Sequence, residues 1–314
     1  VGHAAEEKPI AVTESLCRKS QKLRVMTPTR RQFLRRVAAG GLAVATVGTV
    51  GVQGVRYVTD DAVDAPDAQS GDVQALVAGS LLGLADDVPS ARIEAHGSLT
   101  VRNLVVDGAR DPDVLALADP TLFEGLTDET TLFATNALVL AYDPASSHAD
   151  AIRTDWAGTL ARDDVRVGRT DPKADPLGYR TVLAMQLAEK QGFVSSPRLD
   201  DALVFPETAL MRTLEAGKLD AAFVYENMAH EHDLPFIDLP SSIDFSDPTQ
   251  ADTYATVSLD LPDRTVRGAP IRYGVTALTD AGTRWADALA SDVARLRDHG
   301  FTVPASYPID RPVE

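Results

Sequence analysis

Short apolar segments alternate with segments of helical periodicity from residue 73 onward, and this alternation is the feature that most constrains the fold. The apolar segments 73–78 and 91–95 are followed by Gly79-Ser80 and Gly97-Ser98, and then by apolar residues at helical spacing. Glycine permits a close turn of the backbone, and serine is common where a helix begins. The repeated order of strand, turn and helix predicts an α/β fold with mostly parallel sheets flanked by helices.

The same alternation continues through the rest of the chain. Asp175-Pro176 is a typical N-cap and first-turn pair, and Pro206 begins another helix. A last helix carries Trp285 and Leu296 on one face. Further strands are expected at 114–118, 132–142, 165–167, 221–225 and 271–277.

The length and the residue types exclude several classes of protein. The chain has 314 residues, 44% of them hydrophobic, which is enough for one large or two medium domains with buried cores. The single cysteine, Cys17, excludes a disulfide framework and a cysteine-rich metal site. No phosphate-binding loop, no His-Glu-x-x-His and no Gly-x-Ser-x-Gly nucleophile elbow is present. In His230-Glu231-His232 the two histidines point apart on a helix, so we interpret the segment as a solvated helix face rather than a metal site.

The net charge of −16 is unevenly distributed. Residues 1–56 carry ten Lys and Arg against three acids, whereas residues 57–314 carry 20 basic and 43 acidic groups. The latter acids are 34 Asp and nine Glu, and the bases are 17 Arg and only three Lys. A dense carboxylate surface with almost no lysine indicates adaptation to multimolar salt, the alternative being an acidic mesophilic protein. The same sign disfavours nucleic-acid binding.

The N-terminal region has the pattern of an export signal. Residues 29–36 read Thr-Arg-Arg-Gln-Phe-Leu-Arg-Arg, and the uncharged segment 37–55 follows. This pattern resembles a twin-arginine signal, which we place at 26–56, and its alternative is a membrane anchor. Whether the signal is cleaved stays open. We interpret residues 1–25 as a start-site artefact and the Asp-rich segment 57–72 as a solvated tether.

The two Gly-Ser turns also have the composition of an anion site. At the first turn of a helix the backbone N–H groups have no partner inside the helix, and a serine hydroxyl adds a further donor. Two such turns after strands of one sheet predict a small-oxyanion site between them. The alternative is that Ser80 and Ser98 only cap their helices.

Several blocks between residues 73 and 308 then point to one family. The most specific is Gly-Arg-x-Asp-Pro-x-x-Asp-Pro-x-Gly-Tyr-Arg at 168–180. The others are Val-Ala-Gly-Ser-Leu at 77–81, Phe-Ala-Thr-Asn at 133–136 with the strand 138–142, Pro-Glu-Thr at 206–208, the segment 217–229 and Gly-Ala-Pro-Ile-Arg-Tyr-Gly-Val at 268–275. In this order they resemble the archaeal-type tungstate/molybdate-binding protein of an ABC importer. The resemblance implies a periplasmic-type binding protein whose lobes, 73–133 plus 276–314 and 134–275, close on one oxyanion.

The resemblance also implies the pocket residues: Gly79, Ser80 and Ser98 from the first lobe, and Asp175, Pro176, Leu177, Glu207 and Tyr225 from the second. By the same resemblance, the carboxylates of Asp175 and Glu207 bond to the metal centre of the oxyanion and raise it from four- to six-coordinate. Oxygen donors suit such a hard centre, whereas sulfate cannot expand its shell and would be rejected. The alternative is that Asp175 only caps a helix, and that Glu207 is only a first-turn acid stabilised by the positive end of the helix dipole.

The predicted function is therefore an exported, salt-adapted solute-binding protein that captures tungstate or molybdate and delivers it to an ABC permease in the cell membrane. It is predicted to be a monomer without a cofactor, and not an enzyme. A sulfate or phosphate binder is the alternative within the class. An exported α/β hydrolase using Ser80 or Ser98 would need a histidine partner, and no histidine stands in a recognisable motif. A non-transport sensor with the same fold is a third alternative.

Overall fold

The computed structural model describes residues 73–195 and 199–313. The predicted start-site artefact (1–25), the predicted signal or anchor (26–56) and the predicted acidic tether (57–72) therefore lie outside the described residues. Within the described ranges, no helix is both long enough and apolar enough to cross a membrane.

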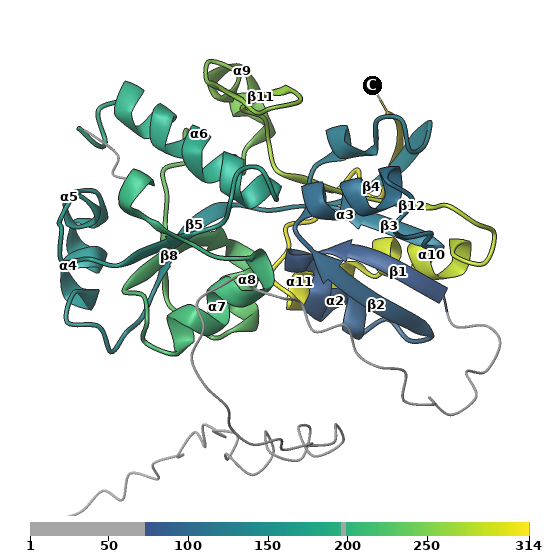
Figure 1. Ribbon diagram of the computed structural model, residues 1–314, viewed down its shortest axis with the longest axis horizontal. Helices are drawn as coiled ribbons and strands as arrows, with labels where there is room; N and C mark the ends of the chain where they lie inside the picture. The colour runs from purple at the N-terminus through teal and green to yellow at the C-terminus, as the bar shows by residue number, and fades with distance from the viewer. Residues whose placement is uncertain (1–72, 196–198, 314) are drawn as a thin grey trace, which may run out of the picture. The chain divides into compact units, whose positions relative to one another are not determined.

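Two mixed sheets with flanking helices form the described part of the chain (Figure 1). The six-stranded sheet has the order β13 (Ile309–Pro312), β4 (Glu129–Thr135), β12 (Arg272–Ala277), β3 (Val114–Leu117), β1 (Val73–Ala78) and β2 (Ala91–His96). The five-stranded sheet has the order β7 (Leu203–Val204), β6 (Val167–Arg169), β8 (Ala221–Tyr225), β5 (Leu138–Tyr142) and β9 (Phe236–Asp238). We call the elements of these sheets the first and the second lobe.

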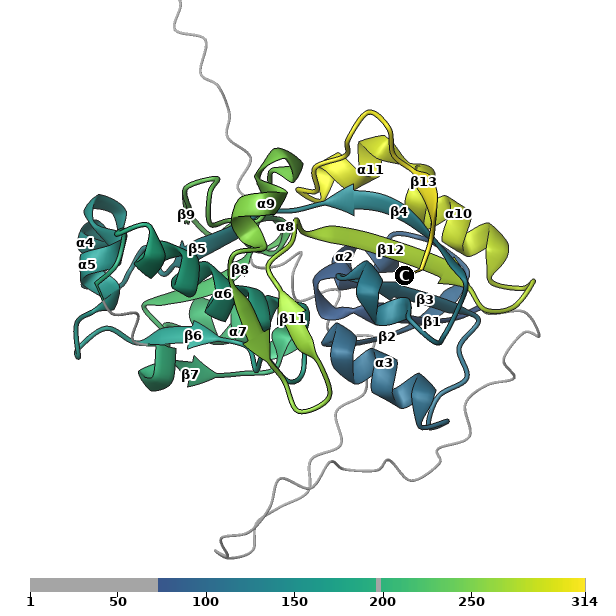
Figure 2. The same ribbon diagram turned by 90° about the horizontal axis from the view of Figure 1, so that it is seen from above.

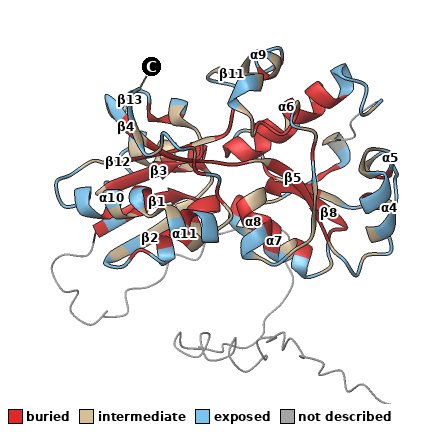
Figure 3. Cartoon of the chain, turned by 180° about the vertical axis from the view of Figure 1, so that it is seen from behind, coloured by how far each residue is buried: buried red, intermediate tan, exposed pale blue. Residues whose placement is uncertain are grey.

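Helices pack on both sheets. The first lobe has η1 (Gly79–Leu81), α2 (Leu82–Asp86), α3 (Ser98–Val106), η2 (Pro120–Phe123), α10 (Thr283–Ser291) and α11 (Val293–Asp298). The second lobe has α4 (Ala149–Thr154), α5 (Trp156–Leu160), α6 (Pro176–Lys190), η3 (Leu199–Asp201), α7 (Glu207–Glu215) and α8 (Glu226–Glu231). η4 (Pro248–Gln250), α9 (Ala251–Tyr254) and the hairpin of β10 (Ser258–Asp260) with β11 (Thr265–Arg267) precede β12. Every residue of β3, β5 and β8 is buried, as expected for central strands covered on both faces (Figure 3).

The α/β fold is as predicted, but its sheets are mixed rather than mostly parallel. β1 is parallel to β2 and β3, and β6 is parallel to β7 and β8. β12 is antiparallel to β3 and β4, and β5 is antiparallel to β8 and β9. Parallel neighbours need a crossover connection within one sheet. β5 and β12 instead enter their sheets from the other lobe, and the strand-and-helix alternation along the sequence does not distinguish the two cases.

Two expected elements are each divided in the structure. The strand expected at 132–142 is β4 and β5, which belong to different sheets, because Asn136 turns the chain between them and accepts the Ala137 N–H through its own side-chain oxygen at 2.9 Å. The last helix is α10 and α11, because Asp292 accepts the Arg295 N–H at 3.0 Å and begins a new helix. β4 thus ends at Thr135, near the predicted lobe limit of 133/134, which remains a prediction.

Candidate oxyanion site

The first predicted turn places Ser80 in the interior. Gly79 and Ser80 lie in η1, directly after β1, and Ser80 is 1% exposed. The Ser80 hydroxyl accepts a hydrogen bond from Tyr273 Oη at 3.2 Å, and its carbonyl accepts one from Asn227 Nδ2 at 2.8 Å. A Cβ at Gly79 would lie 2.7 Å from Glu207 Oε2. A side chain at this position would displace the Glu207 carboxylate from the turn, so glycine permits their close approach.

The second predicted turn brings the two lobes into contact. Ser98 is the first residue of α3 and is fully buried, and its hydroxyl accepts the Ala118 N–H at 3.1 Å. Its own hydrogen remains available to a ligand. A Cβ at Gly97 would lie 2.5 Å from Asp175 Cβ and 2.6 Å from the Ala174 carbonyl oxygen. The N-terminus of α3 therefore lies directly against the Asp175 turn of the second lobe.

The alternative that the two serines only cap their helices is wrong. The N-cap residues are Ala78 and Gly97, and neither helix has a side-chain cap bond. Ser80 and Ser98 lie inside the first turns, where their hydroxyl groups face the interior.

Asp175 is an N-cap, as the sequence allowed, and it is almost completely buried. Its Oδ1 accepts hydrogen bonds from the Gly178 N–H and the Thr170 hydroxyl, both at 3.0 Å. Burial raises the pKa of this carboxyl to about 7, although the Gly178, Thr170 and Leu177 donors oppose the rise. Pro176 and Leu177 are buried in the first turn of α6, and Leu177 supplies the amide N–H that Pro176 lacks.

Glu207 is the second buried carboxyl group of the site. It is the first residue of α7, it is 4% exposed, and its Oε2 has no hydrogen-bond partner among the described residues. Burial and then the charge of Asp175 raise the pKa of Glu207 well above its usual value. The Ser80 hydroxyl and the amides of Gly79 and Ser80 act in the opposite direction. Two like charges in one buried place are unfavourable unless a proton or a positive centre lies between them.

Tyr225, at the end of β8, joins these groups to a buried arginine. Its hydroxyl accepts a hydrogen bond from Arg180 Nη1 at 2.7 Å, so its hydrogen is free to donate elsewhere. Burial raises the pKa of Tyr225 well above 10, Arg180 lowers it, and the charges of Tyr273, Glu207 and Asp175 raise it. The structure therefore brings all eight predicted residues together, through contacts between both lobes.

Sequence reasoning missed four residues whose hydrogen bonds hold this site in place: Asn136, Arg180, Asn227 and Tyr273. Arg180 donates to Tyr225 and to the Ala118 carbonyl at 2.8 Å. Asn136 Nδ2 donates to Asn227 Oδ1 at 2.8 Å and to Tyr273 Oη at 3.3 Å. Each of the four stands in a block that resembles the tungstate/molybdate-binding family, so the blocks were the available signal. Their roles depend on partners 45–193 positions away in the chain and are not visible in local spacing.

Other groups that could carry chemistry are engaged elsewhere. The described residues contain no group of three or more His, Cys, Asp or Glu side chains that could hold a metal ion. His230 and Glu231 are exposed, as expected for a solvated face, and His232 bonds Glu215 at 2.7 Å, whereas Glu231 also bonds His299 of the first lobe at 3.1 Å. His96 bonds Glu94 at 2.9 Å, and among the described residues no hydrogen bond joins a histidine to Ser80 or Ser98.

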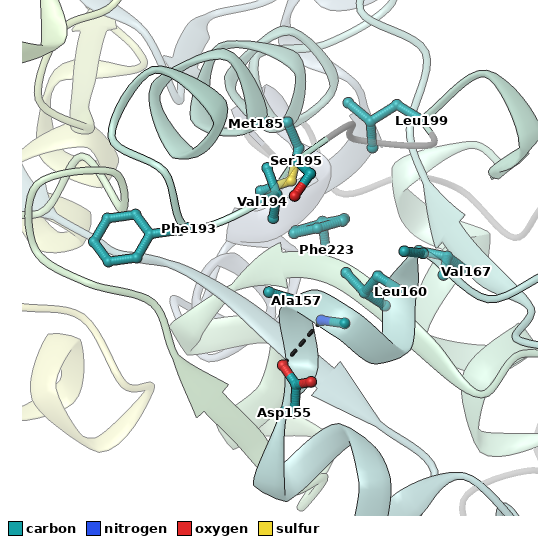
Figure 4. Close-up of a pocket in the computed structure, with 12 residues that line it drawn as sticks. Asp155, Ala157, Leu160, Val167, Met185, Phe193, Val194, Ser195, Leu199 and Phe223 are labelled. Atoms are coloured by element: carbon teal, nitrogen blue, oxygen red, sulfur yellow. Dashed lines mark hydrogen bonds between the residues drawn. The ribbon is translucent and has the colours of Figure 1, made fainter.

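A separate cavity in the second lobe has a different character (Figure 4). Its volume is about 400 Å³, and apolar side chains such as Leu160, Met185 and Phe223 line it. Asp155, the one charged residue among the described residues that line it, caps α5 by accepting the Gly158 N–H at 2.9 Å. The described part of this lining offers an oxyanion no set of charged donors.

Comparison with known proteins identifies the family. A family model described as a bacterial extracellular solute-binding protein matches residues 90–302. A putative ABC transporter molybdenum-binding protein of Haloferax volcanii is 42% identical over 300 residues, covering 89% of this chain and 93% of that protein. A molybdate/tungstate-binding protein of Thermococcus kodakarensis is 35% identical over 230 residues, covering 61% and 64%. The solved periplasmic molybdate-binding protein of Azotobacter vinelandii matches with a TM-score of 0.54 at 16% identity, covering 74% of this chain and 99% of that one.

These matches confirm three predictions made from the sequence. The solved structure confirms the two-lobed fold. The relatives confirm the resemblance to tungstate/molybdate-binding proteins, and they are solute-binding proteins rather than enzymes. The chain belongs to the family of bacterial extracellular solute-binding proteins.

Proposed function

We propose that this protein binds tungstate or molybdate at the buried residues described above and delivers it to an ABC permease. One observation carries the proposal: two buried carboxyl groups, Asp175 and Glu207, share a site whose hydroxyl groups and backbone amides are able to donate hydrogen bonds. A free dianion facing the two carboxyl groups in their ionised form would be repelled, because charges of the same sign would meet in a medium of low dielectric constant.

A metal centre that accepts further oxygen ligands resolves this conflict. Mo(VI) and W(VI) are hard centres, and carboxylate oxygens are suitable ligands for them. In this proposal Asp175 and Glu207 bond to the metal, while Ser80, Ser98, Tyr225 and the amides near Gly79 and Leu177 donate to the oxo groups. Glu207 Oε2, buried without a hydrogen bond among the described residues, is then the oxygen that is ready to become a ligand.

A sulfate or phosphate binder would need a site without ionised carboxylates. Such anions are bound by donors alone, and two unprotonated carboxylates would weaken their binding. Calorimetric titration in high salt with tungstate, molybdate and sulfate tests the proposal. We expect one equivalent of tungstate or molybdate to bind and sulfate to bind at least a hundredfold more weakly. Equal affinity for the three anions would contradict it.

We also propose that the protein is exported by the twin-arginine route, works as a monomer outside the cytoplasm and is adapted to high salt. The support is the Thr-Arg-Arg-Gln-Phe-Leu-Arg-Arg segment at 29–36, the length of the uncharged segment that follows, and the Asp-rich composition. Replacing Arg30 and Arg31 by lysine should retain the protein inside the producing cell, as measured by immunoblotting of cells and medium. Equal export of the variant would contradict this route.

A further inference from the structure

A second feature of the molecule is a cavity of about 950 Å³ that adjoins the buried site. It is lined by α3, η2 and α6, by α9, and by the β10–β11 hairpin with the chain leading into β12. Figure 2 shows β11 between the elements of the two sheets. Directly after the hairpin the chain packs closely on α9, since a Cβ at Gly268 would lie only 2.2 Å from the Tyr254 carbonyl oxygen.

The charge of this cavity is opposite to that of the molecule. Residues 57–314 carry more than twice as many acidic as basic groups, but the cavity is lined by five arginines and four acids. The arginines are Arg102, Arg180, Arg264, Arg267 and Arg272, and the acids are Asp119, Glu124, Asp252 and Asp263.

Within the described ranges, only two of the five cavity arginines, Arg180 and Arg264, lie within ion-pair distance of a cavity carboxylate. Asp263 pairs with Arg264 at 3.0 Å, and Asp119 lies 3.5 Å from Arg180. Arg267 and Arg272 have no ion pair among the described residues. Arg102 donates to the Glu124 carbonyl at 3.0 Å, its charge helps to lower the pKa of Asp263, and its buried Nε has no hydrogen-bond partner in the described part of the chain. Arginine donors of this kind bind the oxygens of small dianions.

The cavity and the buried site share one wall. Arg180 lines the cavity with Asp119, and the same guanidinium donates to Tyr225 Oη at 2.7 Å. Tyr179, next in the chain, donates to the Asp119 carboxylate. Asp119 belongs to the first lobe and Arg180 to the second, so this wall exists only while the lobes are in contact.

We propose that this arginine-lined cavity is an outer anion-binding site, which holds the oxyanion before it reaches the buried residues. The inference rests on the proposed function for the identity of the transported anion. Arg102, Arg267 and Arg272 supply the donors there, and such donors do not distinguish sulfate from tungstate, because both are small tetrahedral dianions that offer oxygens to a guanidinium. Selection between anions then occurs only at Asp175 and Glu207.

The first experiment uses sulfate as the probe, because the buried site is expected to reject it. Arginine Nε–H signals are followed by NMR as potassium sulfate replaces potassium chloride at constant ionic strength, and the variants Arg267→Gln and Arg272→Gln assign the two signals. We expect these signals to shift saturably, with half-saturation at least tenfold below any shift of Arg284 and Arg297, two exposed arginines on α10 and α11. An absence of saturable shifts would overturn the proposal.

The second experiment measures how fast tungstate binds, by stopped-flow fluorescence. The double variant Arg267→Gln/Arg272→Gln should associate at least fivefold more slowly than Arg284→Gln/Arg297→Gln, which loses the same charge elsewhere. Equal rates would show that the cavity is not on the access route. Glu207→Gln separates the two proposals, because it should weaken tungstate binding while leaving the sulfate shifts unchanged. If the parent binds no tungstate at all, the proposed function fails, and the sulfate shifts still decide whether the cavity binds anions.

Discussion

At the scale of single residues, Glu207 separates metal ligation from ordinary hydrogen bonding. In Glu207→Gln the amide still reaches the Gly79-Ser80 turn, but it is a poor ligand for a metal centre. We expect tungstate affinity to fall by about 2–3 kcal/mol, in line with the loss of a charged contact, and the preference over sulfate to narrow. Titration calorimetry with both anions measures this. The matched control is Glu189→Gln, an exposed position on α6. A rise in tungstate affinity would exclude ligation.

Asp175 predicts how the stability of the ligand-free protein depends on pH. Its pKa rises from 3.8 to about 7 on folding, so between these values the folded state holds a proton that the unfolded state has released. The free energy of unfolding should therefore fall as pH rises from about 4 to about 7, and the contribution of this group should then level off.

The variant Asp175→Asn removes this titration and keeps an N-cap residue for α6. Relative to the parent, its unfolding free energy should improve by at most about 4 kcal/mol between pH 4 and pH 8, as measured by denaturant unfolding without ligand. The exposed Asp287→Asn is the control. If the parent and Asp175→Asn profiles run parallel, Asp175 titrates alike in the folded and unfolded states.

At the scale of elements, the contact between the start of α3 and the start of α6 brings the two lobes together. The Thr100 N–H donates to the Ala174 carbonyl at 3.1 Å, and Gly97 leaves no room for a side chain. In Gly97→Ala the added methyl group would meet backbone that cannot rotate away, so the lobes would have to stay apart. We expect at least a tenfold loss of tungstate affinity, with an unfolding temperature within about 2 °C of the parent because neither core is disturbed. Unchanged affinity would show that this contact is not needed for closure.

The sequence predicted where the helices and strands begin and end better than it predicted which strands and residues contact one another. The two Gly-Ser turns, the Asp175 cap and the start of α7 were visible because each depends on a few neighbouring residues. The division at Asn136 was not visible, because apolar residues continue on both sides of it and only the change of sheet separates β4 from β5. Arg180 likewise looked like one residue of a motif, and its contacts with Tyr225 and Ala118 arise only when the lobes meet.

At the scale of the whole molecule, the acidic surface predicts that salt stabilises the folded state. Residues 57–314 carry a net charge of −23 at neutral pH. Repulsion among these charges opposes compaction, and the screening length falls from about 10 Å at 0.1 M salt to about 3 Å at 1 M. The thermal unfolding temperature should therefore rise by about 10 °C or more between 0.1 M and 2 M KCl, with most of the rise below 1 M. Sorbitol at equal osmolality is the control, because it changes water activity without screening charge. An unfolding temperature that does not change with KCl, or that rises equally in sorbitol, would show that the carboxylate surface does not limit stability.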